Sequence, residues 1–407
     1  MGRCTTSRAA SSPAASSTLP GRPRASETVR RYLLYQGAAN SVFYSSIFFV
    51  FYEERLGLTV AAILGLQSYN TAMRALLDLP FGVLADRWSR RGCMMASGTC
   101  LFAACAALLA WPSFAAACFA ETLLAMATAF RSGADSALLF DALESEGQGA
   151  LYAAVESRSQ AIAAVGSGGG AVLGGLLASL DPRLPYAASG LVALVGIAIA
   201  WGLPEARHRV AVAPAPVARL RGAFDVVVSS PGVRWVVGLA VFSVVVSHVY
   251  FYLQQPYLRE VGVPVALFGV VFAATKAVTA LVANYAHRVD ERAGESGAAA
   301  LMGVVPAVGL GAMALSTGPA GAVWILTRGL LDGLWMPLVN IYMNRRVGAD
   351  LRATMLSAQS VAARLTLSLS LALFGLATSA LPLGVLLSGA AVAALACGLV
   401  LAARRRG

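Results

Sequence analysis

Long apolar segments follow one another along most of the chain, each about the length of a membrane span. They run without alternation of polar and apolar positions, which predicts helices rather than the strands of a membrane barrel. A helix needs roughly 20 apolar residues to cross the hydrocarbon core. The first six predicted spans cover residues 31–52, 58–84, 92–111, 115–142, 151–179 and 184–203. Six more follow at residues 232–256, 263–286, 297–315, 320–343, 353–379 and 382–403.

The spacing of these segments divides the chain into two parts of similar size. A weak internal repeat supports the division, because residues 141–174 resemble residues 341–374. We therefore predict an all-α integral membrane protein, with twelve transmembrane helices in two pseudo-symmetric halves. Its parts would be a disordered cytoplasmic tail (1–30), a six-helix bundle (31–203), a cytoplasmic central loop (204–231), a second six-helix bundle (232–403) and a basic tail (404–407).

The composition agrees with a chain covered mostly by lipid. Of its 407 residues, 58% are hydrophobic and 13% are charged. Soluble domains usually carry about a quarter charged residues, so this chain could not cover a water-facing surface. The six cysteines show no Cys-x-x-Cys spacing, and we expect neither a disulfide framework nor a metal site. No cofactor is expected. Residues 1–28 contain no apolar core, so we do not expect a cleaved signal peptide.

The arginines predict the orientation in the membrane. They gather before the first span, in the loops after even-numbered spans and at the C-terminus, whereas the opposite loops contain only Arg55, Arg183 and Arg259. Positively charged loops stay on the cytoplasmic side. We therefore expect a multi-pass protein of the cell membrane with both termini in the cytoplasm. The net charge of +11 then reports topology, and nucleic acid is not an expected partner.

A charged motif lies between the second and third predicted spans. It reads Gly82-Val-Leu-Ala-Asp86-Arg87-Trp-Ser-Arg90-Arg91-Gly92. It resembles the signature loop of the major facilitator superfamily, Gly-x-Leu-Ala-Asp-Arg-x-Gly-Arg-Arg/Lys, with Ser89 in place of the second glycine. Together with the spans and the topology, the resemblance covers residues 31–403. It implies the superfamily fold and secondary transport by alternating access.

The chemistry of this loop suits a gate. Asp86 can accept hydrogen bonds from a neighbouring helix N-terminus. Arg90 and Arg91 can pair with Asp141 or Glu144 at the inner end of the fourth span. Pairs that form in one state and break in another fit alternating access, although the arginines could also simply anchor topology. The predicted gating set is Gly82, Asp86, Arg87, Arg90, Arg91 and Asp141.

The fifth span carries a run of small residues. It resembles the Gly-x-x-x-Gly-Pro-x-x-Gly-Gly motif of superfamily exporters, with Ala171 where that motif has proline, and so implies export. Without the proline, the helix kink does not follow. The alternative is a face for close helix packing. The residues concerned are Gly166, Gly170, Gly174 and Gly175.

Charged residues inside predicted spans usually mark a pathway or a pairing. An Arg-x-x-x-Asp pattern occurs three times, and its spacing places both partners on one helical face. The resemblance implies that the fourth and tenth spans line a central cavity, which would hold the second and third of these pairs. The pairs are Arg74 with Asp78, Arg131 with Asp135, and Arg328 with Asp332.

Several of these groups are candidates for proton or substrate coupling. Asp135 is the first choice for a proton-carrying carboxylate and Asp332 the second, against the alternative of permanent ion pairs. Glu121 is a weaker candidate. Lys276 would pair with Asp332 or contact an anionic substrate, and His248 would relay protons or be a satisfied core histidine. The coupling set is Asp135, Arg131, Asp332, Arg328, Lys276 and His248.

Polar and aromatic residues of the first, seventh and tenth spans complete a possible cavity. A mixed aromatic lining suits amphiphilic organic substrates, although many of these residues could simply hold helices together. The predicted cavity residues are Asn40, Tyr44, Tyr252, Gln254, Gln255, Trp335, Asn340 and Tyr342.

The leading hypothesis is a monomeric, proton-coupled exporter of a small organic molecule or drug, with substrate, protons and the lipid bilayer as its partners. The alternative is an importer of an anionic nutrient held by Arg131, Arg328 and Lys276. The two differ in the sign of the uncompensated charge in the cavity. A membrane-embedded transferase, which would need a metal-binding acidic cluster or a catalytic histidine, and a transport-inactive receptor are more remote alternatives.

Overall fold

The structure is a computed structural model that describes residues 27–205, 225 and 227–406, without the side chains at 79, 82, 83, 85–87, 349, 350, 352–354, 405 and 406. The first elements are α1 (Glu27–Asn40), η1 (Phe43–Ser46), α2 (Phe48–Leu56), α3 (Val60–Arg87), α4 (Arg90–Ala110), α5 (Phe114–Arg131), α6 (Ala134–Ser145), η2 (Gly149–Leu151), α7 (Tyr152–Ala178) and α8 (Leu184–Trp201). The later ones are α10 (Pro231–Glu260), α11 (Val265–Ala283), α12 (Ala286–Leu315), η3 (Pro319–Ile325), α13 (Leu326–Asn344), α14 (Ala349–Thr378) and α15 (Leu383–Arg406).

Among the described residues, ten segments are long and apolar enough to cross a membrane, the first of them α4. The predicted first span is divided into α1, η1 and α2, each shorter than a span. The predicted second span corresponds to α3, which is 28 residues long but carries Arg74 and Asp78 in its interior. Helices are thus found where the apolar segments predicted them, and ten of the described segments are candidate spans, whereas the number twelve stays a prediction.

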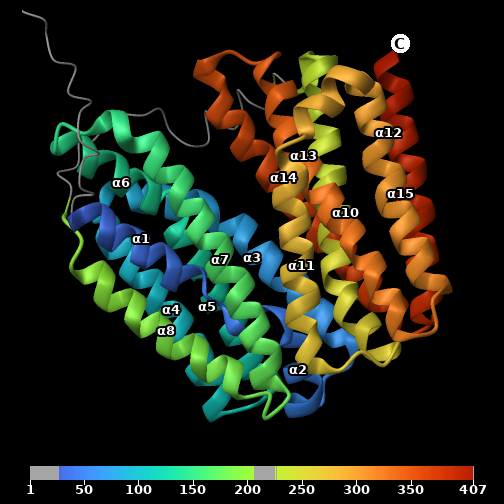
Figure 1. Ribbon diagram of the computed structural model, residues 1–407, viewed down its shortest axis with the longest axis horizontal. Helices are drawn as coiled ribbons and strands as arrows, with labels where there is room; N and C mark the ends of the chain where they lie inside the picture. The colour runs from blue at the N-terminus through green and yellow to red at the C-terminus, as the bar shows by residue number, and fades with distance from the viewer. Residues whose placement is uncertain (1–26, 206–224, 226, 407) are drawn as a thin grey trace, which may run out of the picture.

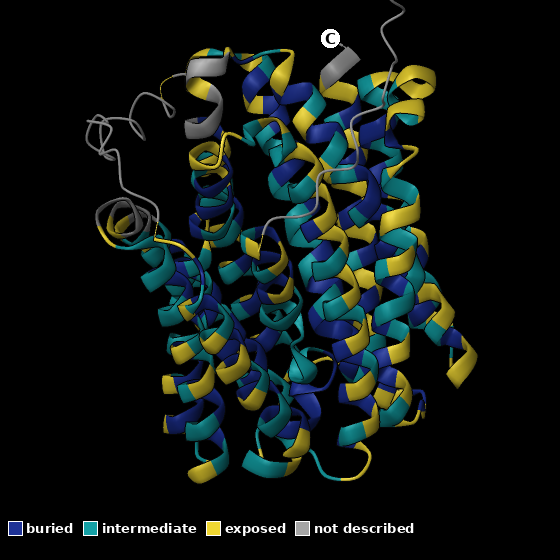
Figure 2. Cartoon of the chain, turned by 60° about the vertical axis from the view of Figure 1, so that its left-hand side comes forward, coloured by how far each residue is buried: buried dark blue, intermediate teal, exposed yellow. Residues whose placement is uncertain are grey.

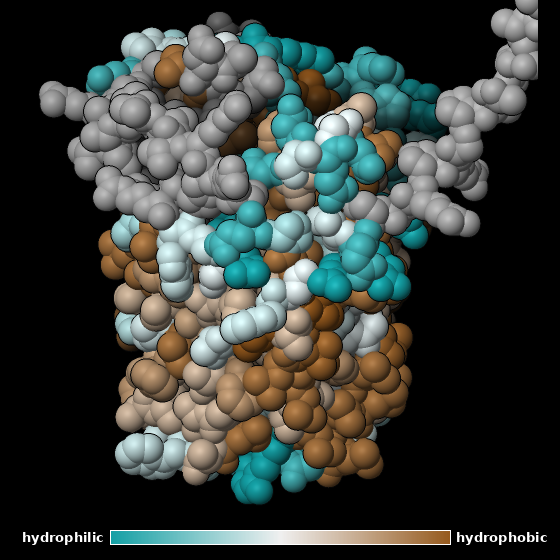
Figure 3. Space-filling view, turned by 90° about the vertical axis from the view of Figure 1, so that its left-hand side faces the viewer, coloured by the Kyte–Doolittle hydropathy of each residue, from teal (hydrophilic) through white to brown (hydrophobic). Residues whose placement is uncertain are grey.

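The outer surface is apolar over a broad area. Figure 2 shows exposed residues along the outward faces of the helices, and many are large and hydrophobic, such as Trp111, Leu315 and Leu376. On the face seen in Figure 3, hydrophobic residues form a wide band, and hydrophilic residues gather mainly toward one end. Such a surface is satisfied by lipid and not by water.

Two sets of helices pack within themselves and touch each other along two seams. In the first set, α4 packs on α5 and α8, and α1 packs on α7 and α8. In the second, α12 packs on α13 and α15, and α10 packs on α13. The seams are α3 with α14 and α7 with α11. Figure 1 shows the two sets side by side, the first in blue to green and the second in yellow to red.

Two helix interruptions determine how side chains are presented to the interior. Residues 41–47 leave the α-helical path between α1 and α2, apart from the 3₁₀ turn η1. The second interruption lies at Ser132–Gly133, where Gly133 has φ 79° and begins α6 in a new direction. A left-handed backbone costs glycine least. The apolar pattern predicted both spans as continuous, because it does not register a single left-handed residue.

Candidate functional site

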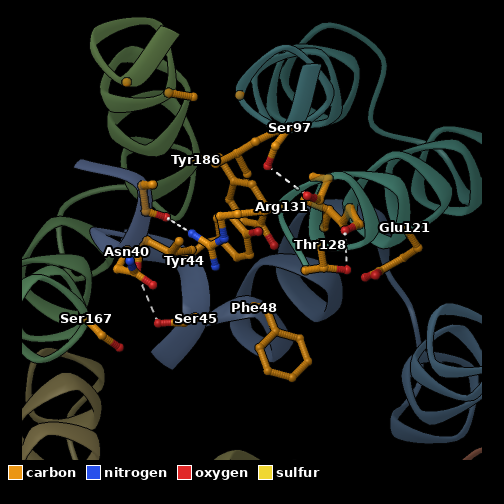
Figure 4. A pocket seen from close by; sticks show the side chains of 18 of the residues that line it. Asn40, Tyr44, Ser45, Phe48, Ser97, Glu121, Thr128, Arg131, Ser167 and Tyr186 are labelled. Carbon is orange, nitrogen blue, oxygen red and sulfur yellow. Dashed lines mark hydrogen bonds between the residues drawn. The ribbon is translucent and has the colours of Figure 1, made fainter. Parts of the chain in front are cut away.

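A cavity of about 350 Å³ lies mainly within the first set of helices. Its walls come from α1, η1, α2, α3, α4, α5, α7 and α8, and two aromatic residues of α10 close one side. Figure 4 shows Arg131 in the middle of this space, with its guanidinium group directed toward the Ala39 carbonyl of α1. The break between α1 and α2 brings both Asn40 and Ser45 to the cavity wall.

Aromatic rings form much of the wall. The rings of Tyr44 and Tyr186 are stacked, with centroids 4.8 Å apart and an interplanar angle of 9°. Phe48 of α2 and Phe251 of α10 stack at 6.0 Å, so an aromatic contact joins the two sets of helices beside the cavity. Offset or parallel aromatic faces of this kind provide a flat apolar surface for a ring-containing ligand.

Glu121 is the one carboxylate among the described residues that line the cavity. Its side chain accepts hydrogen bonds from the Tyr52 hydroxyl and the Gln67 amide, each at 2.7 Å. The residue is only 3% exposed, and no described lysine or arginine lies within ion-pair distance of it. The carboxylate is therefore held by neutral donors.

Two arginines, Arg74 and Arg131, line the same cavity. Arg131 donates from Nη1 to the Ala39 carbonyl at 2.9 Å. The predicted ion pair with Asp135 is absent, because the break at Gly133 ends the helix on which their spacing would place them on one face. Asp135 lies beyond the break and accepts from Gln36 at 3.1 Å.

The predicted pair of Arg74 with Asp78 is also wrong. Asp78 forms an ion pair with Arg364 of α14, across the seam between α3 and α14. The Nε atom of Arg74 is buried and has no hydrogen-bond partner. The spacing within α3 predicted Arg74 as the partner of Asp78, but an arginine of the neighbouring helix α14 pairs with this carboxylate instead.

The third predicted pair is formed. Nε of Arg328 lies 3.4 Å from Asp332 on the continuous helix α13, and both side chains are largely buried. Arg328 also donates to Gln254 at 3.2 Å, and Ser247 donates to Asp332. None of these residues lines the cavity.

The other two coupling candidates also lie apart from the cavity lining. Lys276 forms no ion pair with Asp332 among the described residues, and its Nζ lies 5.7 Å from the centre of the Phe272 ring. His248 shares a hydrogen bond of 2.8 Å between its Nδ1 and the Val244 carbonyl. The histidine is thus satisfied within its own helix.

Of the predicted cavity residues, Asn40, Tyr44 and Tyr252 line the cavity. Gln254 and Gln255 are buried in contacts outside it. The three from α13 lie elsewhere. Trp335 and Tyr342 belong to an apolar cluster around Trp235, and Asn340 is exposed.

Sequence reasoning missed Tyr52, Gln67 and Tyr186 as lining residues. Gln67 carried a usable signal, because an amide inside an apolar span needs a partner. The two tyrosines gave no such signal, because an aromatic residue inside a span is equally compatible with helix packing.

One end of the molecule is held together by contacts between the two sets. Arg259 of α10 pairs with both Glu53 and Glu54 of α2. Close by, the Gln255 amide oxygen accepts from the Phe49 N–H at 3.1 Å. These contacts tie α2 to α10.

A second polar contact crosses the seam between α3 and α14. Ser68 donates to the Ser368 carbonyl at 2.7 Å, and Ser368 donates to the Ser68 carbonyl at 2.9 Å. The two hydroxyl oxygens lie 3.1 Å apart. The reciprocal pair fixes the two helices against each other.

At the opposite end, the described ion pairs stay within one set. The predicted pair of Arg90 with Asp141 is formed, and Arg90 also donates to the Ala137 carbonyl at 2.5 Å. Arg91 pairs with Glu205 at 2.9 Å, and not with Asp141 or Glu144.

The second set has equivalent pairs at that end. Arg345 pairs with Asp290 at 2.6 Å, and Arg346 pairs with Glu295. The remaining residues of the predicted gate, Gly82, Asp86 and Arg87, belong to α3, but their side chains lie outside the described ones.

The glycines of α7 lie at close helix contacts. A Cβ atom at Gly174 would lie 1.8 Å from the Phe43 carbonyl oxygen, and one at Gly166 would lie 2.8 Å from that of Gly37. Gly170 faces the same segment, where a Cβ atom would lie 3.2 Å from the Val42 nitrogen. Gly175 instead faces α11, with a Cβ atom 2.8 Å from the Ala266 carbonyl oxygen.

The helical bundle has an apolar outer surface and a cavity with a mostly aromatic and apolar wall that also carries a few charged side chains, as expected of a multi-pass membrane protein. The family model of the Major Facilitator Superfamily matches residues 33–370, and the chain belongs to this superfamily of transporters. Membership of this superfamily, which the sequence predicted, is thereby confirmed. A comparison with curated protein sequences finds no match.

Solved structures of transporters share the fold. The nucleoside transporter NupG is 12% identical, with a TM-score of 0.75, over 94% of this chain and 100% of the other. The POT family transporter PepTSo is 11% identical, with a TM-score of 0.74, over 94% of this chain and 98% of the other. A D-xylose–proton symporter is 13% identical, with a TM-score of 0.68, over 92% and 94%. At these identities the likeness extends to the fold alone.

Proposed function

We propose that the protein is a secondary active transporter that carries a small organic solute by alternating access. Twelve spans in two six-helix halves, residues 31–203 and 232–403, would rock against each other around the cavity. Both termini would lie in the cytoplasm of a cell whose membrane the protein spans. Membership of the superfamily and the fold shared with three solute transporters support this proposal.

The observation that carries the proposal is that contacts between the two sets of helices are distributed unevenly along the molecule. Contacts between the sets, such as Arg259 with Glu53 and Ser68 with Ser368, reach from one end as far as the pair of Asp78 with Arg364. Beyond that pair, toward the other end, the described ion pairs, such as Arg90 with Asp141 and Arg345 with Asp290, keep to their own set. An alternating-access carrier needs one end closed while the other is free to open.

The coupling ion we propose is the proton, with Glu121 as its carrier in place of Asp135. Glu121 lines the cavity and its hydrogen bonds come from neutral donors. Embedded carboxylates of this kind mark proton relays in transporters. Asp135 lies beyond the helix break and outside the lining.

Export was predicted from the glycines of α7, which also serve close packing against η1 and α11. That motif therefore gives little reason to prefer export over import. Transport assays in proteoliposomes with the pH gradient imposed in either direction would detect both export and import.

A disulfide across the closed end tests alternating access. Ser68→Cys and Ser368→Cys, in a chain with its native cysteines replaced by serine, place two thiols where hydroxyls lie 3.1 Å apart. Uptake of benzoate, benzamide and benzylamine would be measured in proteoliposomes. We expect oxidation to stop transport and reduction to restore it, with each single cysteine variant unaffected. Undiminished transport by the cross-linked protein would contradict alternating access, and no transport of any probe class would contradict the solute-carrier assignment.

The coupling proposal has its own test. Glu121→Gln keeps the shape of the side chain and removes its titration. We expect the variant to lose solute accumulation driven by a pH gradient, while exchange of labelled for unlabelled solute continues. Asp135→Asn serves as the matched control and should keep both activities. The reverse outcome, with accumulation lost only in Asp135→Asn, would return the coupling role to Asp135.

A further inference from the structure

We propose that Arg74 and Arg131 together form the binding site for the anionic group of the solute, and that the solute is an aromatic carboxylate or phosphate monoester. This inference rests on the proposed function, because it names the substrate class of the same cavity. It differs from the anion site that the sequence predicted, which consisted of Arg131, Arg328 and Lys276.

The guanidinium groups of Arg74 and Arg131 are both available to a ligand. Both arginines line the cavity, and neither forms an ion pair with a described carboxylate. Arg131 uses a donor on the Ala39 carbonyl, and Nε of Arg74 has no hydrogen-bond partner. A guanidinium has five N–H donors, so each arginine keeps donors for a ligand.

The nearby carboxylates have other partners and form no ion pair with either arginine. Glu121 accepts from neutral donors, Asp78 is paired with Arg364, and Asp135 accepts from Gln36. The lining therefore carries two positive groups and one negative group among the described residues. An uncompensated charge in a low-dielectric interior is unfavourable, and a bound anion would neutralise it.

The shape of the guanidinium group and the rings near Arg131 suit an aromatic anion. The planar fork of arginine matches carboxylate and phosphate oxygens and binds them through two parallel hydrogen bonds. In Figure 4 the Arg131 side chain extends from α5 into the cavity toward the Ala39 carbonyl, in the region of Tyr44 and Tyr186. An anion bound at Arg131 therefore lies beside the stacked tyrosine pair, whose centroids are 4.8 Å apart. Those rings, with Phe48 and Phe251, offer apolar surface to an aromatic ring attached to the anion.

Two members of the anion site predicted from the sequence, Arg328 and Lys276, do not line the cavity. The charge of Arg328 is neutralised by Asp332. Lys276 lies against Phe272 and does not line the cavity. An anion in the cavity thus meets Arg74 and Arg131.

Ligand-dependent thermal stabilisation of the purified protein in detergent tests this site. The probes are benzoate and phenyl phosphate, with benzamide and benzylamine as neutral and cationic counterparts of similar shape. A ligand that binds only the folded protein raises its unfolding temperature, and at a fixed ligand concentration the rise is larger for a lower Kd. We expect the two anions to stabilise the wild type more than either counterpart.

Three variants sharpen the test. Arg131→Gln and Arg74→Gln should each weaken anion binding at least about tenfold, because each removes charge-assisted hydrogen bonds. Arg131→Lys keeps the charge but not the fork, and should lie between wild type and Arg131→Gln. The matched control is Arg288→Gln, at an exposed arginine over the Tyr285 ring outside the cavity, which should leave anion binding unchanged.

The outcomes separate this proposal from the proposed function. Stabilisation by anions that disappears in both glutamine variants supports the site. Stabilisation by benzamide or benzylamine alone, or by anions equally in Arg131→Gln and the wild type, overturns the anion site while leaving a solute carrier. Absence of stabilisation by either anion at millimolar concentration overturns it as well. The disulfide experiment on Ser68 and Ser368 decides the transport mechanism independently.

Discussion

Two Arg-x-x-x-Asp segments occupy near-equivalent places in the two sets of helices, yet only one of them forms an ion pair. Arg328 and Asp332 lie on the continuous helix α13 and form a buried ion pair. Arg131 and Asp135 are separated by a left-handed glycine that ends α5 and begins α6. The first pair is neutral and lies outside the cavity lining, whereas Arg131 reaches into the cavity without a carboxylate partner.

The difference teaches that spacing within a helix gives a pairing only where the helix continues. An i,i+4 relation puts two side chains on one face through the regular turn of 3.6 residues. One residue with positive φ removes that relation. Here the removal has a functional consequence, because it turns a structural ion pair into a free cation beside an aromatic wall.

The largest effect we predict comes from breaking the intact pair. Arg328→Gln leaves Asp332 buried without a cation, which costs about 3 kcal/mol of unfolding free energy. Arg131→Gln, which breaks no pair, should leave unfolding within about 0.5 kcal/mol of the wild type. Denaturation in mixed detergent micelles measures both. The double variant Arg328→Gln/Asp332→Asn should recover most of the loss, and equal destabilisation by both single arginine variants would contradict the comparison.

A smaller effect is predicted for the packing that holds the α1–η1 segment, whose Ala39 carbonyl supports Arg131. A Cβ atom at Gly174 would lie 1.8 Å from the Phe43 carbonyl oxygen, so Gly174→Ala forces η1 away from α7. We expect a loss of about 2 kcal/mol in unfolding free energy, as for overpacked interiors. Gly169→Ala on the same helix is the matched control, since its Cβ atom would meet nothing within 4 Å. Equal stability of the two variants would show that this contact does not hold α1–η1.

The smallest predicted effect concerns the break itself. Gly133→Ala meets no neighbouring atom, so its only direct effect is a strain of about 1–2 kcal/mol from the positive φ. This strain favours a continuous helix that would reunite Arg131 with Asp135. We expect weaker binding of phenyl phosphate, by a few-fold, in a titration of the purified protein. Gly147→Ala, also at a positive φ of 69° but outside the cavity lining, should bind normally, and weakening in both variants alike would mean that strain alone is responsible.

Apolar pattern predicted the helices well. The predicted span 92–111 corresponds to α4 (Arg90–Ala110), and the predicted span 184–203 corresponds to α8 (Leu184–Trp201). Chain length and hydropathy determine such boundaries, because lipid requires about 20 apolar residues in every span. The breaks near Phe43 and Gly133 escaped prediction, since one or two residues hardly change an average over a span.

The candidate site was only partly predictable for a related reason. Its polar residues were recognised as unusual inside a membrane, but their partners come from other helices. Asp78 pairs with Arg364, whose position is nearly 300 residues further along the chain, and Glu121 is held by Tyr52 and Gln67. Such contacts depend on helix packing, which the spacing along one helix does not encode.

The most direct test of the account is the affinity for phenyl phosphate, measured by calorimetric titration in two variants that each remove arginine charge from one segment. Arg328→Gln/Asp332→Asn removes the paired charges, and Arg131→Gln removes the free one. We expect binding within about twofold of the wild type for the double variant, and binding at least about tenfold weaker for Arg131→Gln. Weaker binding in the double variant, with normal binding in Arg131→Gln, would contradict the account and place the anion beside Arg328.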